Sequence, residues 1–262
     1  MALQSEAPGK PRLSYAEARG SATGQTPVLA IHGNFSSKGW WRELLHDPPP
    51  DSRLLVPDLP GFGHSAAGRD FVPSMRLYAD ALRSFLDDLG VDEAVLLGHS
   101  MGGAVAMQLA LSEPERFPAM MLLSPAPPQG IDTPDYVYPI LKGLRHNRRA
   151  LRRALKRMMR SRVPGYLEDL VEDARMMHPK GFAGNARLLS QWSLDGNPAR
   201  YQSPVLVVSG DRDTLVPPSS AESTARAFPG GEHVLLPGVT HSPQIEAPEK
   251  VKPLLERFIR EP

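Results

Sequence analysis

Short runs of apolar residues recur along this chain of 262 residues, and they constrain its fold more than any other feature. Each run is only a few residues long, holds many β-branched residues and stops at Gly, Pro or Asp, which predicts a strand. Strands that are apolar throughout suit a sheet that is covered on both faces, as parallel sheets are. The runs occupy residues 27–33, 53–59, 93–99, 119–125, 204–210 and 232–238.

Helical patterns with one apolar face lie between these runs at 74–90 and 102–113, and a further one follows the last run at 250–261. Alternation of strands and helices predicts an α/β fold with a mostly parallel sheet. The connection over 126–203 contains no convincing strand and is far longer than the dozen or so residues that a crossover needs. We therefore expect a core formed by 1–125 and 204–262, with 126–203 inserted as a helical cap.

Two segments of the predicted cap carry opposite charges. The pattern predicts a basic amphipathic helix over 144–162, with nine Arg and Lys residues and no acid, and an acidic amphipathic helix over 165–178. The simplest interpretation is that each helix buries its apolar face and leaves its charges solvated or loosely paired. The alternative is that the basic helix attracts an anionic substrate or a lipid surface.

The segment "GHSMG" at 98–102 places Ser100 between a strand and a helix. This G-x-S-x-G pattern is typical of a nucleophilic serine on a sharp strand-to-helix turn, where crowding requires small neighbours. A serine hydroxyl becomes a good nucleophile when a base accepts its proton and a third group orients that base. The partners are expected downstream, first an acid and then a histidine.

Both partners follow later predicted strands. His241 lies in the loop after the last strand, and "GDRD" offers Asp211 and Asp213 after the strand before it. We favour Asp213, because an acid that reaches the histidine must lie beyond the end of its strand. The predicted catalytic set is Ser100, Asp213 and His241, in that order.

These motifs together resemble the α/β-hydrolase superfamily over essentially the whole chain. The segments that carry the resemblance are "AIHGNFSS", "VPDLPGFGHS", "GHSMGG", "GDRDTLVP" and "THSPQIEAPE". The resemblance implies an eight-stranded, mostly parallel sheet with a helical cap after strand six, and it implies that the first two strands lie within 11–26. Superfamily members that carry aspartate at the position of Ser100 are haloalkane dehalogenases and epoxide hydrolases. A serine at this position therefore indicates acyl transfer.

The same resemblance assigns roles around the serine. It implies an oxyanion hole formed by the backbone N–H groups of Met101 and Asn34. The alternatives for Asn34 are that its side-chain amide donates, or that its segment is a simple turn that ends the strand. Beside these roles, His32 is interpreted as bracing the loop that carries Asn34, and Asp58 and His64 are interpreted as fixing nearby loops. His99 is interpreted as a packing residue.

Composition limits the other classes of function. A net charge of +1 gives no general argument for a nucleic-acid or membrane partner, and the absence of cysteine excludes a thiol nucleophile. The chain shows no secretory signal pattern, no transmembrane run and no metal-binding motif. We expect a cytoplasmic serine hydrolase acting on a small-molecule carboxylic ester, lactone or thioester, with no cofactor, metal, nucleic acid or stable membrane anchor. The alternatives are an acyltransferase or perhydrolase on this fold, or a non-catalytic binding protein.

Overall fold

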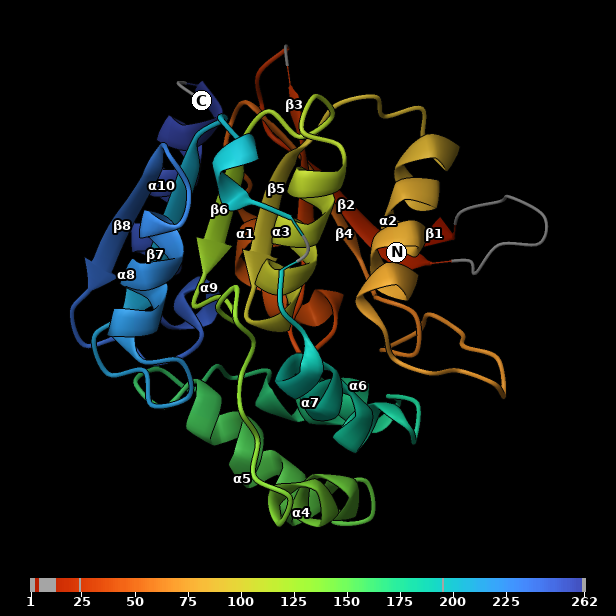
Figure 1. Ribbon diagram of the computed structural model, residues 1–262. Coiled ribbons are helices and arrows are strands. Elements are labelled where there is room, and N and C mark those ends of the chain that lie inside the picture. Colours follow the sequence, from red (N-terminus) through yellow and green to blue (C-terminus); the bar gives the residue numbers. More distant parts are fainter. Residues whose placement is uncertain (1–2, 5–12, 24, 195, 261–262) are drawn as a thin grey trace.

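The computed structural model describes residues 3–4, 13–23, 25–194 and 196–260 and contains one sheet, with strand order β1-β2-β4-β3-β5-β6-β7-β8 (Figure 1). β2 pairs antiparallel with β1 and β4, and the other pairs are parallel. The predicted α/β class with a mostly parallel sheet is therefore confirmed. The strands are β1 (Leu3–Gln4), β2 (Ser14–Arg19), β3 (Thr26–Ile31), β4 (Ser52–Pro57), β5 (Val95–His99), β6 (Met120–Leu123), β7 (Val205–Gly210) and β8 (Gly231–Leu236).

The prediction that the first two strands both lie within 11–26 is wrong for one of them. β2 lies in that range, but β1 lies earlier in the chain and pairs Leu3 with Tyr15 and Gln4 with Ser14. A strand of two residues has no apolar period that a sequence pattern could reveal.

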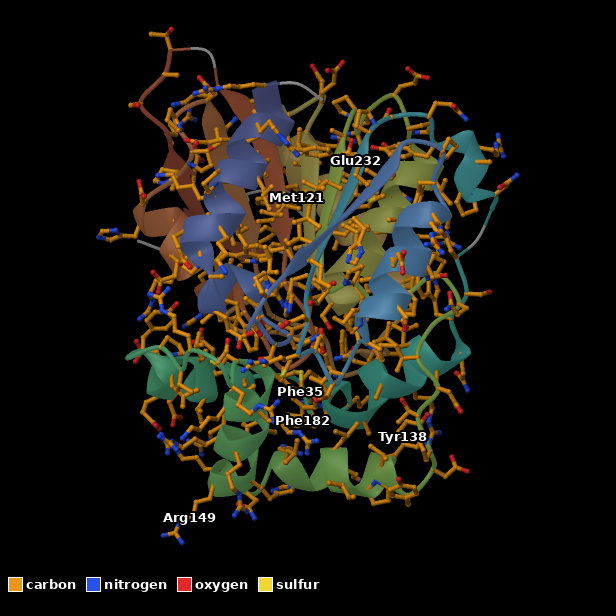
Figure 2. All side chains as sticks on the ribbon, turned by 90° about the vertical axis from the view of Figure 1, so that its left-hand side faces the viewer. Phe35, Met121, Tyr138, Arg149, Phe182 and Glu232 are labelled. Carbon is orange, nitrogen blue, oxygen red and sulfur yellow. The ribbon has the colours of Figure 1, made fainter. Side chains whose placement is uncertain are left out.

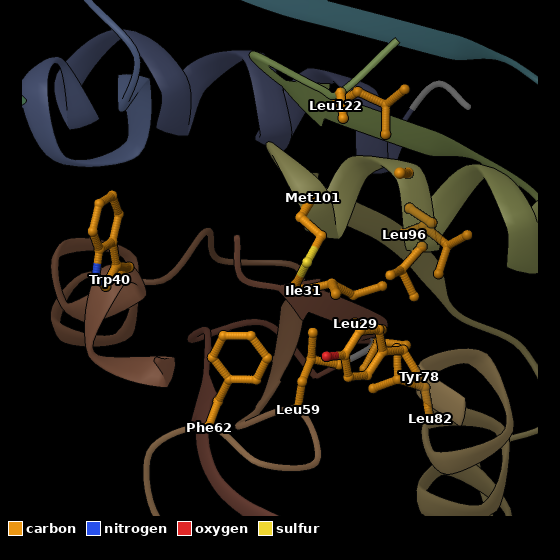
Figure 3. Close-up of a cluster of buried hydrophobic side chains, with 14 of the residues drawn as sticks. Leu29, Ile31, Trp40, Leu59, Phe62, Tyr78, Leu82, Leu96, Met101 and Leu122 are labelled. Atoms are coloured by element: carbon orange, nitrogen blue, oxygen red, sulfur yellow. The ribbon is translucent and has the colours of Figure 1, made fainter. Parts of the chain in front are cut away.

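Helices cover both faces of the sheet, which explains why its central strands are apolar throughout. Side chains alternate between the faces, so Leu29 and Ile31 join one buried cluster while Val28 and Ala30 join the other. Figure 3 shows part of the first cluster, in which Leu29 and Ile31 lie near Leu96 and Met101. The first face is covered by α2 (Met75–Asp88), α3 (Met101–Ser112) and α8 (Pro218–Arg226), and the second by α1 (Arg42–His46) and α10 (Pro248–Arg260).

The helices between β6 and β7 form a separate layer below the sheet, on the side to which the carboxyl end of β6 points (Figure 1). The basic helix is shorter than the predicted 144–162 at both ends, because Leu144 ends the preceding helix and the basic helix itself ends at Met158. The Asn147 side chain then accepts a hydrogen bond from the N–H of Ala150 and caps a new helix. The inserted helices are α4 (Val137–Leu144), α5 (Arg148–Met158), α6 (Leu167–Arg175) and α7 (Gly181–Gln191), followed by the 3-10 turn η2 (Pro198–Arg200).

Charges on α5 and α6 pair across the surface. The Arg148 guanidinium lies 2.7 Å from carboxylate oxygens of both Glu168 and Glu172, and Arg152 lies 2.6 Å from Glu168. These half-exposed pairs agree with the interpretation of two helices whose charges are loosely paired, and each adds little stability. No helix in the described ranges is long and apolar enough to cross a bilayer.

Candidate active site

Ser100 occupies the sharp turn between β5 and α3. Its backbone has φ 54° and ψ −118°, an unusual conformation for a residue with a side chain. The flanking glycines allow this turn, since a methyl group on Gly102 would lie 2.2 Å from the Ile31 carbonyl oxygen. A methyl group on Gly98 would lie 2.6 Å from the Gly102 carbonyl oxygen. The sequence pattern around Ser100 thus has a steric cause.

The structure brings Ser100, His241 and Asp213 into one chain of hydrogen bonds. The His241 Nε2 atom lies 3.0 Å from Ser100 Oγ, and its Nδ1 atom lies 2.7 Å from Asp213 Oδ2. His241 follows β8, Asp213 follows β7 and Ser100 follows β5, so three parallel strands deliver them to the same edge of the sheet. With Nδ1–H donated to the carboxylate, the lone pair of Nε2 faces the serine hydroxyl.

Asp213 is held as a carboxylate. Its Oδ1 atom accepts the backbone N–H groups of Leu215 at 2.8 Å and Val216 at 2.9 Å. Burial raises the pKa of the Asp213 carboxyl, but the His241 ring and these two N–H groups outweigh burial, so the pKa lies below its ordinary 3.8. The alternative acid Asp211 is exposed and accepts the N–H of Gly238 at 2.7 Å instead.

Two backbone N–H groups near Ser100 have no acceptor in the described part of the protein. They belong to Met101, the first residue of α3, and to Asn34, in the turn after β3. The turn lies close to the serine, because a methyl group on Gly33 would lie 3.0 Å from Ser100 Cβ. The backbone therefore offers two free donors beside the serine hydroxyl.

Two buried histidines brace these loops. His32 donates from Nδ1 to the Gly33 carbonyl at 2.9 Å and accepts at Nε2 the N–H of Leu59 at 3.0 Å, in line with its predicted bracing role. His99 stacks on Trp40 and donates from Nε2 to the His241 carbonyl at 2.8 Å. Burial, with the nearby His241 ring, lowers the pKa of His99 to about 3, so it stays neutral.

Asp58 fixes loops as predicted. Its buried carboxylate accepts the backbone N–H of Lys38 at 2.7 Å and that of His64 at 3.0 Å, and it pairs with the Lys38 ammonium. His64 takes part through its backbone, while its ring is more than half exposed. In the described ranges no three His, Cys, Asp or Glu side chains come together in a way that could hold a metal ion.

Residues 26–248 match the sequence model of a family described as the alpha/beta hydrolase fold. The chain belongs to the α/β-hydrolase family. Among solved structures, this α/β-hydrolase resembles the enol-lactonase from Burkholderia xenovorans LB400, with TM-score 0.86 and 20% identity over 99% of this chain and 100% of that one. It also resembles a thermophilic esterase from Thermogutta terrifontis, with TM-score 0.81 and 24% identity over 100% of this chain and 98% of that one. These two likenesses show the fold.

Curated relatives are more similar in sequence. The pimeloyl-[acyl-carrier protein] methyl ester esterase of Yersinia pseudotuberculosis is 28% identical over 251 residues, which cover 91% of this hydrolase and 95% of that enzyme. The dihydrolipoyllysine-residue acetyltransferase component of the acetoin cleaving system of Pseudomonas putida is 29% identical over 249 residues. That match covers 90% of this chain but only 64% of the relative, so the chain spans less than two thirds of that protein.

Two buried polar residues of this hydrolase are not predicted by the sequence patterns. Glu246 accepts the backbone N–H groups of Thr240 at 3.1 Å and Ser242 at 2.9 Å, on either side of His241, and that of Ser161 at 2.8 Å. It thereby ties the histidine loop to the segment after α5. Glu246 lies in the segment "THSPQIEAPE", and an acid within an apolar stretch is the sequence signal that could have identified it.

The second such residue is Asn185 on α7, which contacts Asn34. No sequence pattern marks it, because a single asparagine in a helical segment gives no information about its partner.

Proposed function

We propose that this protein is a serine hydrolase that cleaves carboxylic esters through an acyl-enzyme, with Ser100, His241 and Asp213 as its catalytic triad. The observation that carries the proposal is the continuous hydrogen-bonded chain, 3.0 Å from Ser100 Oγ to His241 Nε2 and 2.7 Å from His241 Nδ1 to Asp213. This arrangement supplies a nucleophile, a base and an orienting carboxylate.

In the first half of the reaction, Ser100 Oγ attacks the acyl carbon while His241 Nε2 takes the hydroxyl proton. The carbonyl oxygen becomes an oxyanion, which accepts hydrogen bonds from the N–H groups of Met101 and Asn34. Collapse of this intermediate breaks the bond to the alcohol, and His241 returns the proton to that alcohol. Asp213 keeps the imidazole in the required tautomer and stabilises its charged form.

In the second half, His241 takes a proton from water, and the hydroxide oxygen bonds to the acyl carbon of Ser100. The same two N–H groups bind the second oxyanion. Its collapse releases the acid and returns the proton to Ser100. The two free donors are already in place before the charge forms, so little reorganisation is needed when it does.

We further propose that residues 126–203 act as a cap over this site, with 1–125 and 204–262 as the hydrolase core. The Met158 carbonyl, at the end of α5, accepts the Ser242 hydroxyl at 2.8 Å, and Asn185 of α7 contacts the turn at Asn34. The inserted helices thus contact the loops on both sides of the serine. Ser100 is only 9% exposed, which supports a role for these helices in screening the site from bulk solvent.

A carboxylic ester is the proposed substrate class, since the Yersinia relative is named for a methyl ester. The test is a panel of p-nitrophenyl esters and lactones of increasing acyl length, assayed with the wild type, Ser100→Ala and Ser112→Ala. Ser112 lies at the far end of α3 and serves as the matched control. We expect Ser100→Ala to lose all but a few per cent of turnover and Ser112→Ala to retain it. Equal turnover by both variants would refute the mechanism.

A further inference from the structure

Asn185 on α7 is fully buried, and both ends of its amide are used. Its Oδ1 accepts the hydroxyl of Tyr78, on α2, at 2.6 Å, and its Nδ2 donates to Asn34 Oδ1 at 3.0 Å. Burying an amide is costly without such partners, so this side chain is held in one orientation. Because the Tyr78 hydroxyl donates its hydrogen bond to Oδ1, the Nδ2 atom of Asn185 faces Asn34.

The acceptor, Asn34, lies in the turn that carries a proposed oxyanion donor. Its Oδ1 also accepts the N–H of Phe35 at 3.0 Å, and Phe35 has φ 57°, an uncommon conformation for a residue other than glycine. The Asn34 side-chain oxygen therefore accepts two hydrogen bonds, one from within the turn and one from α7. Together they fix the unusual backbone conformation of the turn.

A second contact joins α7 to the same turn. The Phe35 ring packs edge-on against Phe182 of α7, with ring centroids 5.8 Å apart. Figure 2 shows these two rings next to each other, between the inserted helices and the sheet. One helix outside the hydrolase core thus holds the turn through a polar and an aromatic contact.

We propose that Asn185 is a positioning residue for the oxyanion hole. It fixes the Asn34 side chain, and through it the turn, so that the Asn34 N–H points to the oxygen of the intermediate on Ser100. The inference rests on the proposed function. Asn185 does not touch the substrate in this account, so its loss acts on the charged intermediate and leaves binding of the neutral ester unchanged.

The first test compares Asn185→Ala, Asn34→Ala and the double variant with a p-nitrophenyl ester. Complete loss of an oxyanion donor costs about 10²–10³ in turnover, and a displaced donor keeps part of its effect, so we expect kcat to fall roughly 10- to 30-fold in Asn185→Ala with KM within about twofold. Because Asn185 acts through Asn34, the double variant should be no slower than Asn34→Ala. An aryl trifluoromethyl ketone, which forms a tetrahedral adduct on serine, should lose affinity by the same factor as kcat/KM.

The second test uses a matched pair of tyrosines and remains available if Asn185→Ala fails to fold. Tyr78→Phe removes the hydroxyl that orients Asn185 and should lower kcat about three- to tenfold. Tyr201 also donates a buried hydrogen bond of 2.6 Å, to the Phe117 carbonyl. Phe117 precedes β6, so this bond lies at the amino end of that strand, whereas the candidate site lies at the carboxyl ends of the strands. Tyr201→Phe should lower stability similarly and leave kcat unchanged.

Equal kcat in Tyr78→Phe and Tyr201→Phe would overturn the proposal, as would losses that multiply in the double variant. A rise in KM at unchanged kcat in Asn185→Ala would also overturn it. If Ser100→Ala keeps its activity, the proposed function itself fails. If Ser100→Ala is inactive while Asn185→Ala and Tyr78→Phe are normal, only the role of Asn185 fails.

Discussion

Two aspartates that lie two residues apart offer a sharp test of which carboxylate serves the triad. Asp213 is buried and bonded to His241, whereas Asp211 is exposed and bonded to the N–H of Gly238. Each is replaced by asparagine, which preserves the shape of the side chain. The pair of variants therefore tests which of the two carboxylates the reaction needs.

The expected loss in Asp213→Asn follows from the partners of its two oxygens. Oδ1 accepts two backbone N–H groups, so the amide oxygen takes that place and the amide nitrogen faces His241. His241 Nδ1 must then accept a hydrogen bond instead of donating one. The imidazole proton moves to Nε2, which faces Ser100, and the base is lost. In serine proteases, the same change of tautomer lowers kcat by up to about 10⁴-fold.

We expect Asp213→Asn to lose at least about a hundredfold in kcat/KM, or roughly 2.7 kcal/mol of transition-state stabilisation. Asp211→Asn should lose less than about tenfold, because an amide oxygen still accepts the Gly238 N–H. The assay is p-nitrophenyl ester hydrolysis at equal concentrations of folded enzyme. The reverse ordering would show that Asp211 serves the triad, and two small effects would place the acid elsewhere.

Three further predictions concern stability and charge. Acid should lower the free energy of unfolding through His99 by roughly 1.4 kcal/mol per pH unit, between the ordinary histidine pKa of 6.5 and the pKa of about 3 that His99 has in the folded protein, because only the unfolded chain takes up the proton in that range. Denaturant titrations of His99→Gln at several pH values should lack this share of the slope, and identical slopes would contradict the prediction. Gly102→Ala should prevent soluble expression, since its methyl group would lie 2.2 Å from the Ile31 carbonyl oxygen, whereas Gly143→Ala, with open space around it, should express normally. Arg149 on α5 points outward from the molecule (Figure 2), so raising salt should change kcat/KM equally for anionic and neutral esters, and a fall confined to anionic esters would instead assign α5 a steering role.

Much of the fold follows from local patterns that burial on two faces imposes. The runs at 27–33 and 93–99 are apolar because alternate side chains enter different clusters, so the pattern predicts both the strands and their coverage. β1 could not be found this way, since two residues show no period. The pattern predicts a basic helix that is too long, because apolar periodicity runs through Asn147, whose capping hydrogen bond starts a new helix.

The site residues likewise divide into those that a local sequence pattern predicts and those that only tertiary packing determines. Ser100, Asp213 and His241 follow recognisable strands, and the turn chemistry around them leaves a sequence pattern. Asn185 depends on α7 packing against the turn at Asn34, 151 residues earlier in the chain. Such a partner is set by tertiary packing alone, and no local pattern carries it.

The most direct test of the account is to trap the acyl-enzyme on Ser100. The protein is mixed with an excess of a slowly hydrolysed p-nitrophenyl ester, quenched in acid during turnover, digested and analysed by mass spectrometry. We predict a burst of one p-nitrophenol per active site and an added acyl mass on the peptide that contains Ser100. The adduct should be absent from Ser100→Ala. Turnover without a burst or adduct, or an adduct on another residue, would contradict the central claim.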